Sequence, residues 1–346
     1  MALYQRIKRQ FLSKIHLVRL VIGIGIVLGM FALWTWVLRP LYINLSHINQ
    51  SLNIQLQQSQ DRTNFLLLGI GGGDHEGSDL TDTMILVSVN QTTGDVAMIS
   101  VPRDIWVPSM RAKVNTAYHY GEEKQQGGGF VLAKSAVSEI VGLPVHYAAL
   151  INFANFEKFI DSIGGVDINV QTAFDDYEYP IPGRENDLCD GDPQTKCRFE
   201  HLHFDQGLRH MSGNLALKYV RSRHAVGDEG SDFARSRRQE NLILAIKTKL
   251  VSKEILANPA KIKSIYASLA KSFTSDFGSN LYPALVKLGL KAGKSKIRTL
   301  TLTENLFINP PISALFDFQW VLIPKDNSFE SLSSYIKNFL TAPVQK

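Results

Sequence analysis

The sequence predicts an α/β protein: a three-layer α/β/α domain with a mixed central sheet, preceded by one N-terminal transmembrane helix. Short apolar runs with the alternation of strands recur between segments with the period of helices, as in a sheet covered by helices. A glycine-rich loop directly follows the first of these runs, and residues 20–38 contain no charged side chain. No internal repeat or break in composition demands a second domain, so residues 64–346 are predicted to form one globular unit.

The N-terminal region has the charge pattern of a membrane anchor. Residues 1–19 carry five basic side chains and no acidic one. The 19 uncharged residues that follow can span the hydrocarbon core as a helix, with Trp34 and Trp36 near its outer end. The positive-inside rule places the N-terminus in the cytoplasm, residues 39–63 as a juxtamembrane spacer, and the remainder outside. A cleaved signal peptide is the alternative, but no small-x-small cleavage site follows Trp36.

The elements of the domain follow from local periodicity. Apolar runs at 65–70, 84–89 and 96–101 predict buried strands, and the turn at 92–95 predicts a hairpin between the last two. Residues 171–206 are acidic and show no periodicity, so we expect an irregular, lid-like insertion there. The other predicted elements are strands at 146–151, 166–170, 296–302 and 320–323, and helices at 130–141, 153–162 (ended by Gly164-Gly165), 212–219, 232–250, 258–271, 280–291 and 328–340.

Composition excludes one large class of function. The hydrophobic fraction of 45% and aromatic fraction of 10% suit an ordinary globular core, and the net charge is only +5. The chain has neither zinc-finger spacing nor an extended basic patch with interleaved aromatic residues. We therefore expect no nucleic-acid partner.

The two cysteines agree with an extracytoplasmic domain. Cys189 and Cys197 lie in a segment rich in Asp, Gly and Pro, where a disulfide would close a short loop. Two free thiols are the alternative. A zinc site would need further ligands, and His201 and His203 nearby do not show a regular ligand spacing.

Five arginines fall within 18 residues, in Tyr219-Val220-Arg221-Ser222-Arg223-His224 and Asp232-Phe233-Ala234-Arg235-Ser236-Arg237-Arg238-Gln239. In a helix over 232–250, Arg235, Arg238 and Gln239 share one face at the first turn. Free N–H groups and the positive end of the dipole at that helix terminus suit phosphate, as do guanidinium groups. The pattern indicates a pyrophosphate clamp. The alternative is a solvated basic helix end paired with the acidic residues at 228, 229 and 232.

Two further segments carry charged groups that follow predicted strands. The loop after the first strand, residues 69–83, is rich in glycine and aspartate. Glycine lets the backbone approach a ligand closely, and Mg²⁺ binds through one or two carboxylates together with substrate phosphates. The segment Ser100-Val101-Pro102-Arg103-Asp104 ends another strand and presents Arg103, for which a surface salt bridge is the alternative.

Taken together, these motifs resemble the LytR-CpsA-Psr family of bacterial cell-envelope proteins. The resemblance covers residues 64–250, with 251–346 completing the domain, and the anchor agrees with it. The motifs occur in this order: the Gly/Asp loop ending in Asp82-Thr83-Met84, Ser100-Val101-Pro102-Arg103-Asp104, Lys113-Val114-Asn115, Gly164-Gly165-Val166-Asp167, Tyr219-Val220-Arg221-Ser222-Arg223, and Asp232-x-x-Arg235-x-x-Arg238-Gln239.

The resemblance implies a phosphotransferase. Such enzymes move a glycopolymer from a polyprenyl-pyrophosphate carrier in the membrane lipid to peptidoglycan through a phosphodiester, assisted by Mg²⁺ (or Mn²⁺). The implied catalytic residues are Arg103, Asp104, Arg221, Arg223 and Arg235, with Asp104 as proton acceptor or as a residue that orients Arg103. The implied pyrophosphate-binding set adds Lys113, Arg238 and Gln239. The implied metal ligands are Asp82 together with Asp79 or Asp74.

The sequence departs from the family pattern at two positions. Gly71 stands at or near the place of a usual aspartate, and Leu80 stands where an arginine usually precedes the Ser-Asp-Thr element. The element itself has Thr81 in place of serine. Two other functions therefore remain open, a polyprenyl-pyrophosphate pyrophosphatase and a non-catalytic envelope sensor that binds polyprenyl phosphate.

Overall fold

The structure, a computed structural model, describes residues 54–342 except 73–76, 185, 294 and 303. The described residues divide into two compact units. One contains residues 54–56 and Ser279–Lys287, and with them the beginning of helix α10 (Tyr282–Ala292). The other contains Gln57–Gly278 and the chain from Leu288 onward, and it holds all the elements discussed below.

A mixed sheet runs through the larger unit. Among the described residues its strand order is β11–β6–β1–β2–β3–β12, with β1–β6 and β3–β12 parallel and the other pairs antiparallel. The strands are β1 (Arg62–Ile70), β2 (Thr81–Asn90), β3 (Val96–Ser100), β6 (Tyr147–Asn152), β11 (Phe273–Ser275) and β12 (Ile297–Thr301). This arrangement confirms the α/β class and the mixed sheet. The hairpin predicted from the turn at 92–95 is also present, with Val89 opposite Val96.

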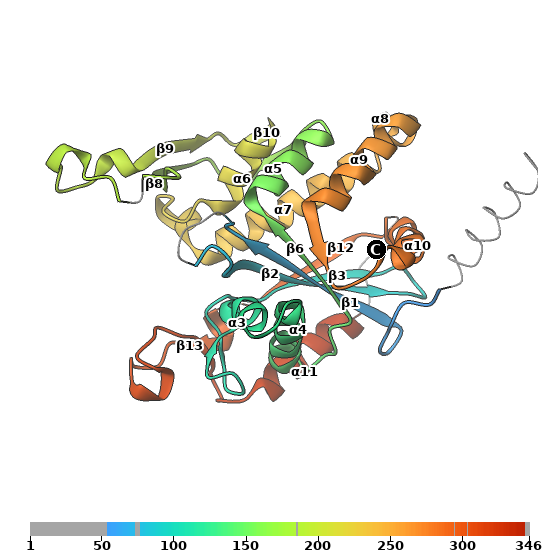
Figure 1. Cartoon of the computed structure of the whole chain (residues 1–346), viewed down its shortest axis with the longest axis horizontal. Coiled ribbons are helices and arrows are strands. Elements are labelled where there is room, and N and C mark those ends of the chain that lie inside the picture. The colour runs from blue at the N-terminus through green and yellow to red at the C-terminus, as the bar shows by residue number, and fades with distance from the viewer. Residues whose placement is uncertain (1–53, 73–76, 185, 294, 303, 343–346) are drawn as a thin grey trace, which may run out of the picture. The chain divides into compact units, whose positions relative to one another are not determined.

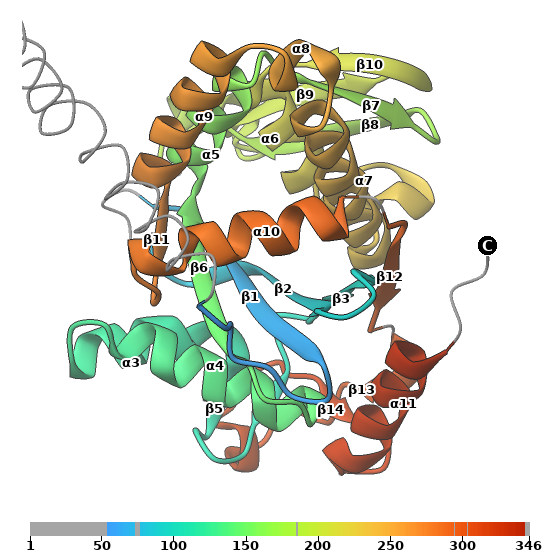
Figure 2. The ribbon, with the colours of Figure 1, turned by 90° about the vertical axis from the view of Figure 1, so that its right-hand side faces the viewer.

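Helices cover both faces of this sheet, as Figures 1 and 2 show. One face carries α3 (Ala117–Lys124), α4 (Gly128–Val141) and α11 (Phe329–Thr341). The other carries α5 (Phe153–Ser162), α6 (Gly213–Arg221), α7 (Asp232–Leu250), the short α8 (Lys253–Leu256) and α9 (Pro259–Ser272). The helices lie within a few residues of the predicted ranges. Helices α3 and α8 and strands β10 (Gly207–Met211) and β11 were not predicted.

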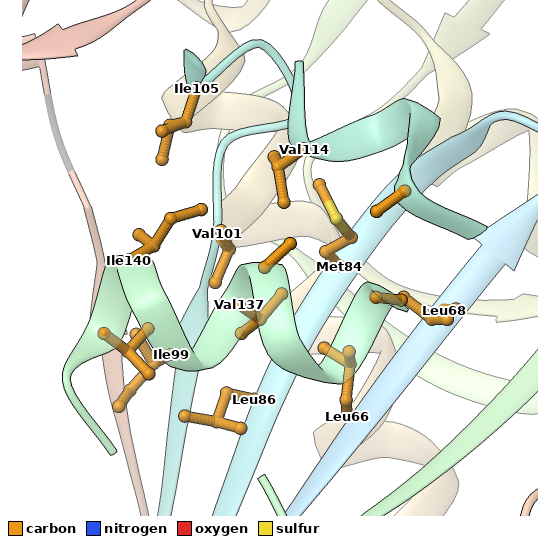
Figure 3. Close-up of a cluster of buried hydrophobic side chains, with 14 of the residues drawn as sticks. Leu66, Leu68, Met84, Leu86, Ile99, Val101, Ile105, Val114, Val137 and Ile140 are labelled. Atoms are coloured by element: carbon orange, nitrogen blue, oxygen red, sulfur yellow. The ribbon is translucent and has the colours of Figure 1, made fainter. Parts of the chain in front are cut away.

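The alternation of side chains along β1 and β2 gives the two faces of the sheet different roles. Leu66, Leu68, Met84 and Leu86 belong to a fully buried core that packs against α4 (Figure 3). The intervening residues, such as Ile85, point to the opposite face because successive strand side chains alternate. Burial on the first face stabilises the sheet, and the second face is left available to line a site.

The helical face has a core of its own. Phe159 and Ile160 of α5, Tyr219 of α6 and Leu242 of α7 are buried in it. Residues Gly164 and Gly165 end α5 with positive φ angles of 84° and 75°, which a side chain would disfavour, as their sequence predicted. The layer of α5, α6 and α7 is thereby held over the free face of the sheet.

The segment 171–206 is more ordered than expected. Strands β8 (Phe174–Pro180) and β9 (Phe199–Phe204) form an antiparallel pair, so the prediction of an irregular insertion was wrong. The pairing register of β8 and β9 shifts between Asp176 and Tyr179. This shift interrupts the alternation of buried and exposed side chains from which a strand is predicted. A disulfide joins Cys189 to Cys197 in the loop between these strands.

Two predicted strands have partners outside the central sheet. Strand β7 (Val166–Val170) pairs with β10 (Gly207–Met211). The strand expected at 320–323 is reduced to β14 (Ile323–Pro324), which pairs with β13 (Phe307–Ile308). Its apolar residues serve another purpose, since Val321 packs with Trp106 and Phe316. The remaining short strands are β4 (Trp106–Val107) and β5 (Ala112–Lys113).

None of the helices in the described part of the chain has the length and apolar character needed to cross a membrane. The transmembrane helix predicted at 20–38 and most of the spacer predicted at 39–63 lie outside the described residues.

Replacing Cys189 and Cys197 together by serine should loosen the β8–β9 loop without unfolding the domain. The disulfide spans eight residues of sequence, and the described residues between 181 and 198 contain no buried core side chain. The lost loop constraint is at most roughly 2–3 kcal/mol and acts locally. Amide hydrogen exchange should accelerate in β8 and β9 but not in β1–β3. Faster exchange throughout the central sheet would contradict this view.

Candidate functional site

The centre of the site is the carboxylate of Asp82, near the start of β2. Its Oδ1 atom accepts a hydrogen bond from Arg103 Nη1 at 2.5 Å and another from Arg223 Nη2 at 3.1 Å. Arg103 follows β3 through the segment Val101-Pro102, and Arg223 follows the end of α6. Three segments that are distant in sequence therefore place charged groups around one carboxylate.

Asp82 remains ionised in this environment. Burial by itself would raise the pKa of Asp82, but the charges and hydrogen bonds of Arg223 and Arg103 together outweigh burial and leave the pKa below its usual value. The carboxylate thus neutralises part of the positive charge while the arginines keep donor groups for a further anion.

Arg221 lies against aromatic rings on the other side of the cluster. Its guanidinium carbon lies 4.1 Å from the centre of the Phe153 ring, and Nη1 donates to the Tyr179 hydroxyl at 3.4 Å. The guanidinium plane can stack on an aromatic face and keep its remaining N–H groups for another acceptor. Phe153 begins α5 and Tyr179 belongs to β8, so the 171–206 segment contributes to the site.

A buried polar network fixes the turn that carries Arg221 and Arg223. The hydroxyl of Ser222 donates to Asp176 Oδ2 at 2.6 Å, and the backbone N–H of His224 donates to the same atom at 3.3 Å. Ser222 and Asp176 are both fully buried. Because the middle residue of Arg-Ser-Arg is held inside, its two neighbours are directed to the surface of the site.

Arg238 follows Arg235 by one turn of α7, as predicted, but its side chain is buried in this network and does not lie on the site surface where the prediction placed it. Its side chain is 2% exposed, Nη2 donates to the carbonyl oxygen of Ser222 at 2.7 Å, and Nη1 donates to Glu229 Oε2 at 2.9 Å. Arg238 lies three residues after Arg235, at the other edge of the same helix face, and there its guanidinium group reaches these buried acceptors. Its role in the structure is to hold the Arg-Ser-Arg turn.

Arg235 and Gln239 do face the cluster. Both line the cavity described below, and Gln239 Nε2 donates to Thr83 Oγ1 at 3.2 Å, beside Asp82. The start of α7 is less open than the sequence suggested. Ser231 caps the helix by accepting the N–H of Ala234 at 3.2 Å, so one of the expected free amides is already bonded.

Asp104 and Lys113 form a supporting pair behind Arg103. Lys113 Nζ donates to Asp104 Oδ1 at 2.9 Å, and Asp104 Oδ2 lies 3.4 Å from Arg103 Nε. Lys113 does not line the cavity described below. These contacts favour an orienting role for Asp104, with Lys113 acting through it.

The candidate metal ligands are not gathered at one point. Asp79 Oδ2 lies 2.7 Å from Nδ1 of His119 on α3, and Asp74 lies outside the described residues. Among the described residues, no group of three acidic, histidine or cysteine ligands surrounds Asp82. Asp82 provides the carboxylate that Arg103 and Arg223 share. One carboxylate suits a Mg²⁺ ion that also binds substrate phosphates, but it does not make a site built from protein ligands alone.

A deep cavity of about 440 Å³ opens beside the cluster. Part of its lining consists of Asp82, Arg221, Arg223, Arg235 and Gln239, and we call this polar end the mouth. The rest of its lining is mostly apolar and lies between the free face of the sheet and the helices that cover it. The interior residues include Leu67, Ile85, Ile151, Phe153, Phe156, Leu217, Val220, Ile243, Ile246 and Phe273. The arrangement suits an amphiphile that has a long apolar chain and an anionic head.

The apolar lining was not predicted from the sequence. The stripe that continues α7 as Leu242 and Ile246 was assigned to the core, whereas Ile246 is only half-buried and both line the cavity. A signal was available in α5, where Phe153, Phe156 and Phe159 repeat every three residues and place three aromatic rings on one helix face.

The chain has relatives among known proteins. The sequence model of the LytR_cpsA_psr family matches residues 43–334. The polyisoprenyl-teichoic acid–peptidoglycan teichoic acid transferase TagU of Oceanobacillus iheyensis is 32% identical over 216 residues. The transferase of the same description named TagV, from Bacillus subtilis, is 24% identical over 244 residues. The matches cover 61% and 68% of this chain and only 58% and 55% of those relatives.

The fold has a counterpart among solved structures. The crystal structure of B. subtilis TagV matches with a TM-score of 0.57 and 22% sequence identity. The match covers 83% of this chain and 100% of that chain. It shows that the two proteins share the fold.

Two arginines one turn apart on α7 should respond differently to the same substitution. Arg238→Met would leave Glu229 and the Ser222 carbonyl without their buried partner, so we expect unfolding to become easier by about 3 kcal/mol in urea. Arg235→Met should cost less than about 1 kcal/mol, because Arg235 is only partly buried, at the cavity mouth. Arg235→Met should instead weaken the binding of inorganic pyrophosphate in calorimetry. Equal destabilisation by both variants would contradict the assignment.

Proposed function

Because the chain belongs to the LytR-CpsA-Psr family, we propose that it is a membrane-anchored phosphotransferase that moves a glycopolymer from a polyprenyl-pyrophosphate carrier to peptidoglycan. The observation that carries this proposal is the apolar cavity that ends in a cluster of guanidinium groups. A polyprenyl pyrophosphate has the same division into a long hydrocarbon chain and a dense anionic head. The names of the relatives, as teichoic acid transferases, support the same class of reaction.

The apolar cavity suits the carrier chain. Its walls are aliphatic and aromatic side chains from β1, β2, β6, α5, α6 and α7. Each methylene group transferred from water to such walls contributes about 0.8 kcal/mol, so a few isoprene units would anchor the substrate. The head group would then lie at the mouth, among Arg221, Arg223 and Arg235.

The chemistry proposed at the mouth is a substitution at phosphorus. A sugar hydroxyl of the acceptor forms a new P–O bond to the phosphorus that bears the glycopolymer. The bond from that phosphorus to the bridging oxygen breaks, and polyprenyl phosphate leaves with the electron pair. Arginine side chains stabilise the charge that develops on the phosphate oxygens. Asp104 orients Arg103 for this role or accepts the proton of the hydroxyl, and its contacts with Lys113 and Arg103 favour the first.

Mg²⁺ (or Mn²⁺) is proposed as the cofactor. Asp82 would hold it together with phosphate oxygens of the substrate, and the ion would supply further positive charge to the leaving phosphate. Asp82 would have to exchange at least one of its arginine partners for the ion. Asp79 is the weaker candidate because its carboxylate contacts His119.

The proposed location is the outer face of the cell membrane. The uncharged run at 20–38 and the basic residues before it support a single span with the N-terminus inside. The disulfide supports an oxidising compartment for the domain. A site near the membrane would meet a lipid-linked donor in the outer leaflet.

Replacing Arg221 or Arg223 by alanine should reduce transfer on the order of a hundredfold, since each would remove a charged contact to the pyrophosphate. The assay incubates the purified full chain in detergent with a lipid-pyrophosphate-linked saccharide, peptidoglycan oligomers and Mg²⁺. Arg237→Ala is the matched control, because Arg237 is 54% exposed, contacts Glu229 and does not line the cavity. Phosphate release that does not depend on acceptor would identify a pyrophosphatase. Lipid binding without any turnover would identify a binding module.

Asp82→Asn should remove most of the Mg²⁺ affinity measured in the presence of a prenyl pyrophosphate and lower turnover by a hundredfold or so. Without metal, the same variant should bind the pyrophosphate more tightly, because a repelling charge is gone and two arginines are released. The pKa of Asp82 is below its usual value, so its protonation lies below the assay range and Mg²⁺ affinity should be flat from about pH 5 to 8. Asp79→Asn is the comparison. If it abolishes metal binding and Asp82→Asn does not, the ligand is Asp79.

A further inference from the structure

A cluster of histidine and aspartate side chains lies on the outer face of the β8–β9 pair. His201 and His203 flank the buried Leu202 on β9, so both rings project to the solvent side of the strand. Asp175 on β8 stands directly opposite His203 in the pairing register. None of these three polar residues lines the apolar cavity, so the cluster is separate from the site described above.

Both rings are directed at one carboxylate oxygen. Asp175 Oδ1 lies 2.7 Å from His201 Nε2 and 2.8 Å from His203 Nδ1. Two imidazole nitrogens and a carboxylate are a donor set that zinc and similar transition-metal ions take, whereas Mg²⁺ and Ca²⁺ take oxygen ligands. The spacing of the two histidines along the chain does not show this set, because its third member comes from the neighbouring strand.

Neighbouring groups orient each ring. His203 Nε2, on the other side of the ring, lies 3.1 Å from Asp205 Oδ1, and Arg209 Nη2 binds the second oxygen of Asp205 at 2.9 Å. A histidine that binds a metal through one nitrogen commonly donates the other N–H to a carboxylate in this way, which sets its tautomer. The His201 ring stacks on Tyr177, with centroids 4.3 Å apart and planes inclined by 8°. Each ring thus presents its remaining nitrogen to the same point.

Binding of an ion requires the two rings to close on it. The three ligand groups stand farther apart in the structure than ligands around one ion, since zinc lies about 2.0–2.1 Å from an imidazole nitrogen. The side chains of His201 and His203 are 48% and 49% exposed, so the rings have room to move. Asp175 would change from the acceptor shared by both rings to the third ligand of the ion.

We propose that Asp175, His201 and His203 bind a divalent transition-metal ion of the zinc type. Water would complete a tetrahedral coordination shell, as in other sites with three protein ligands. This ion is distinct from the Mg²⁺ proposed at Asp82, and its binding does not depend on the transfer reaction.

The proposed ion lies behind the strand that supports the arginine cluster. Asp175 and Asp176 are neighbours on β8, and Asp176 is buried and holds the Arg-Ser-Arg turn through Ser222. The backbone N–H of Val226, just after this turn, donates to the Asp175 carbonyl oxygen at 2.8 Å. An ion that joins β8 to β9 would therefore stiffen the strand on which the turn depends.

The test titrates Zn²⁺ into the full chain in detergent, expressed without a histidine tag and stripped of metal with EDTA. Calorimetry should show one ion bound per chain. His201→Gln and His203→Gln should each weaken binding at least roughly tenfold, because each removes a ligand. Asp205→Asn should weaken it by about tenfold, because it removes the carboxylate that orients the His203 ring. Zn²⁺ should also slow amide hydrogen exchange in β8 and β9 of the wild-type protein.

His210→Gln is the matched control, because His210 Nδ1 lies 2.7 Å from Asp167 Oδ1 in an exposed pair of the same kind on β10 and β7. The control should bind Zn²⁺ as the wild type does. Failure of the wild type to bind Zn²⁺, or equal losses with His203→Gln and His210→Gln, would reduce the cluster to surface ion pairs and overturn the site. Binding that is lost with Asp82→Asn and kept with His203→Gln would place the ion at the arginine cluster and would also overturn it.

Discussion

The ion pairs of Asp82 are the interaction on which the rest of the site depends. Several guanidinium groups converge within one small region, and without a counter-charge they would repel one another. Asp82 accepts from Arg103 and Arg223 at once, and it thereby joins β2 to the segment after β3 and to the turn after α6. One carboxylate cannot neutralise the whole cluster. The remaining positive charge is available to an anion with more than one negative charge, which is the property a pyrophosphate has.

The buried and the accessible arginines of the two motifs have different roles. Arg238 is buried, bonded to Glu229 and to the Ser222 carbonyl, and holds the turn together from below. Asp176 holds the same turn from the other side through Ser222 and His224. This largely buried network restricts the Arg-Ser-Arg turn, so Arg221 and Arg223 need not be ordered when a ligand binds. Preorganisation of this kind strengthens both binding and transition-state stabilisation.

The central sheet supports the site by using its two faces differently. Leu66, Leu68 and Met84 build the core with α4, which fixes β1 and β2 in place. The alternate residues on the same strands, such as Ile85, line the apolar cavity together with α5 and α7. A cavity is tolerated on this face because the opposite face carries the stabilising burial. The residues that stabilise the fold and the residues that line the cavity therefore lie on opposite faces of the same sheet.

The sequence by itself determined the features that depend on neighbours along the chain. The strands β1 to β3, the hairpin at 92–95 and the helix over 232–250 follow from local periodicity, and the ordered motifs identified the family. Only the tertiary structure decided which side chains meet. Arg223 reaches a carboxylate 141 residues away, and Arg238, identical to Arg235 in its local pattern, is taken out of the site by Glu229 and Ser222. The apolar cavity was likewise invisible, because a residue that lines a cavity and one that fills a core have the same hydrophobic pattern. The difference lies in what packs against them, and segments distant in sequence supply that.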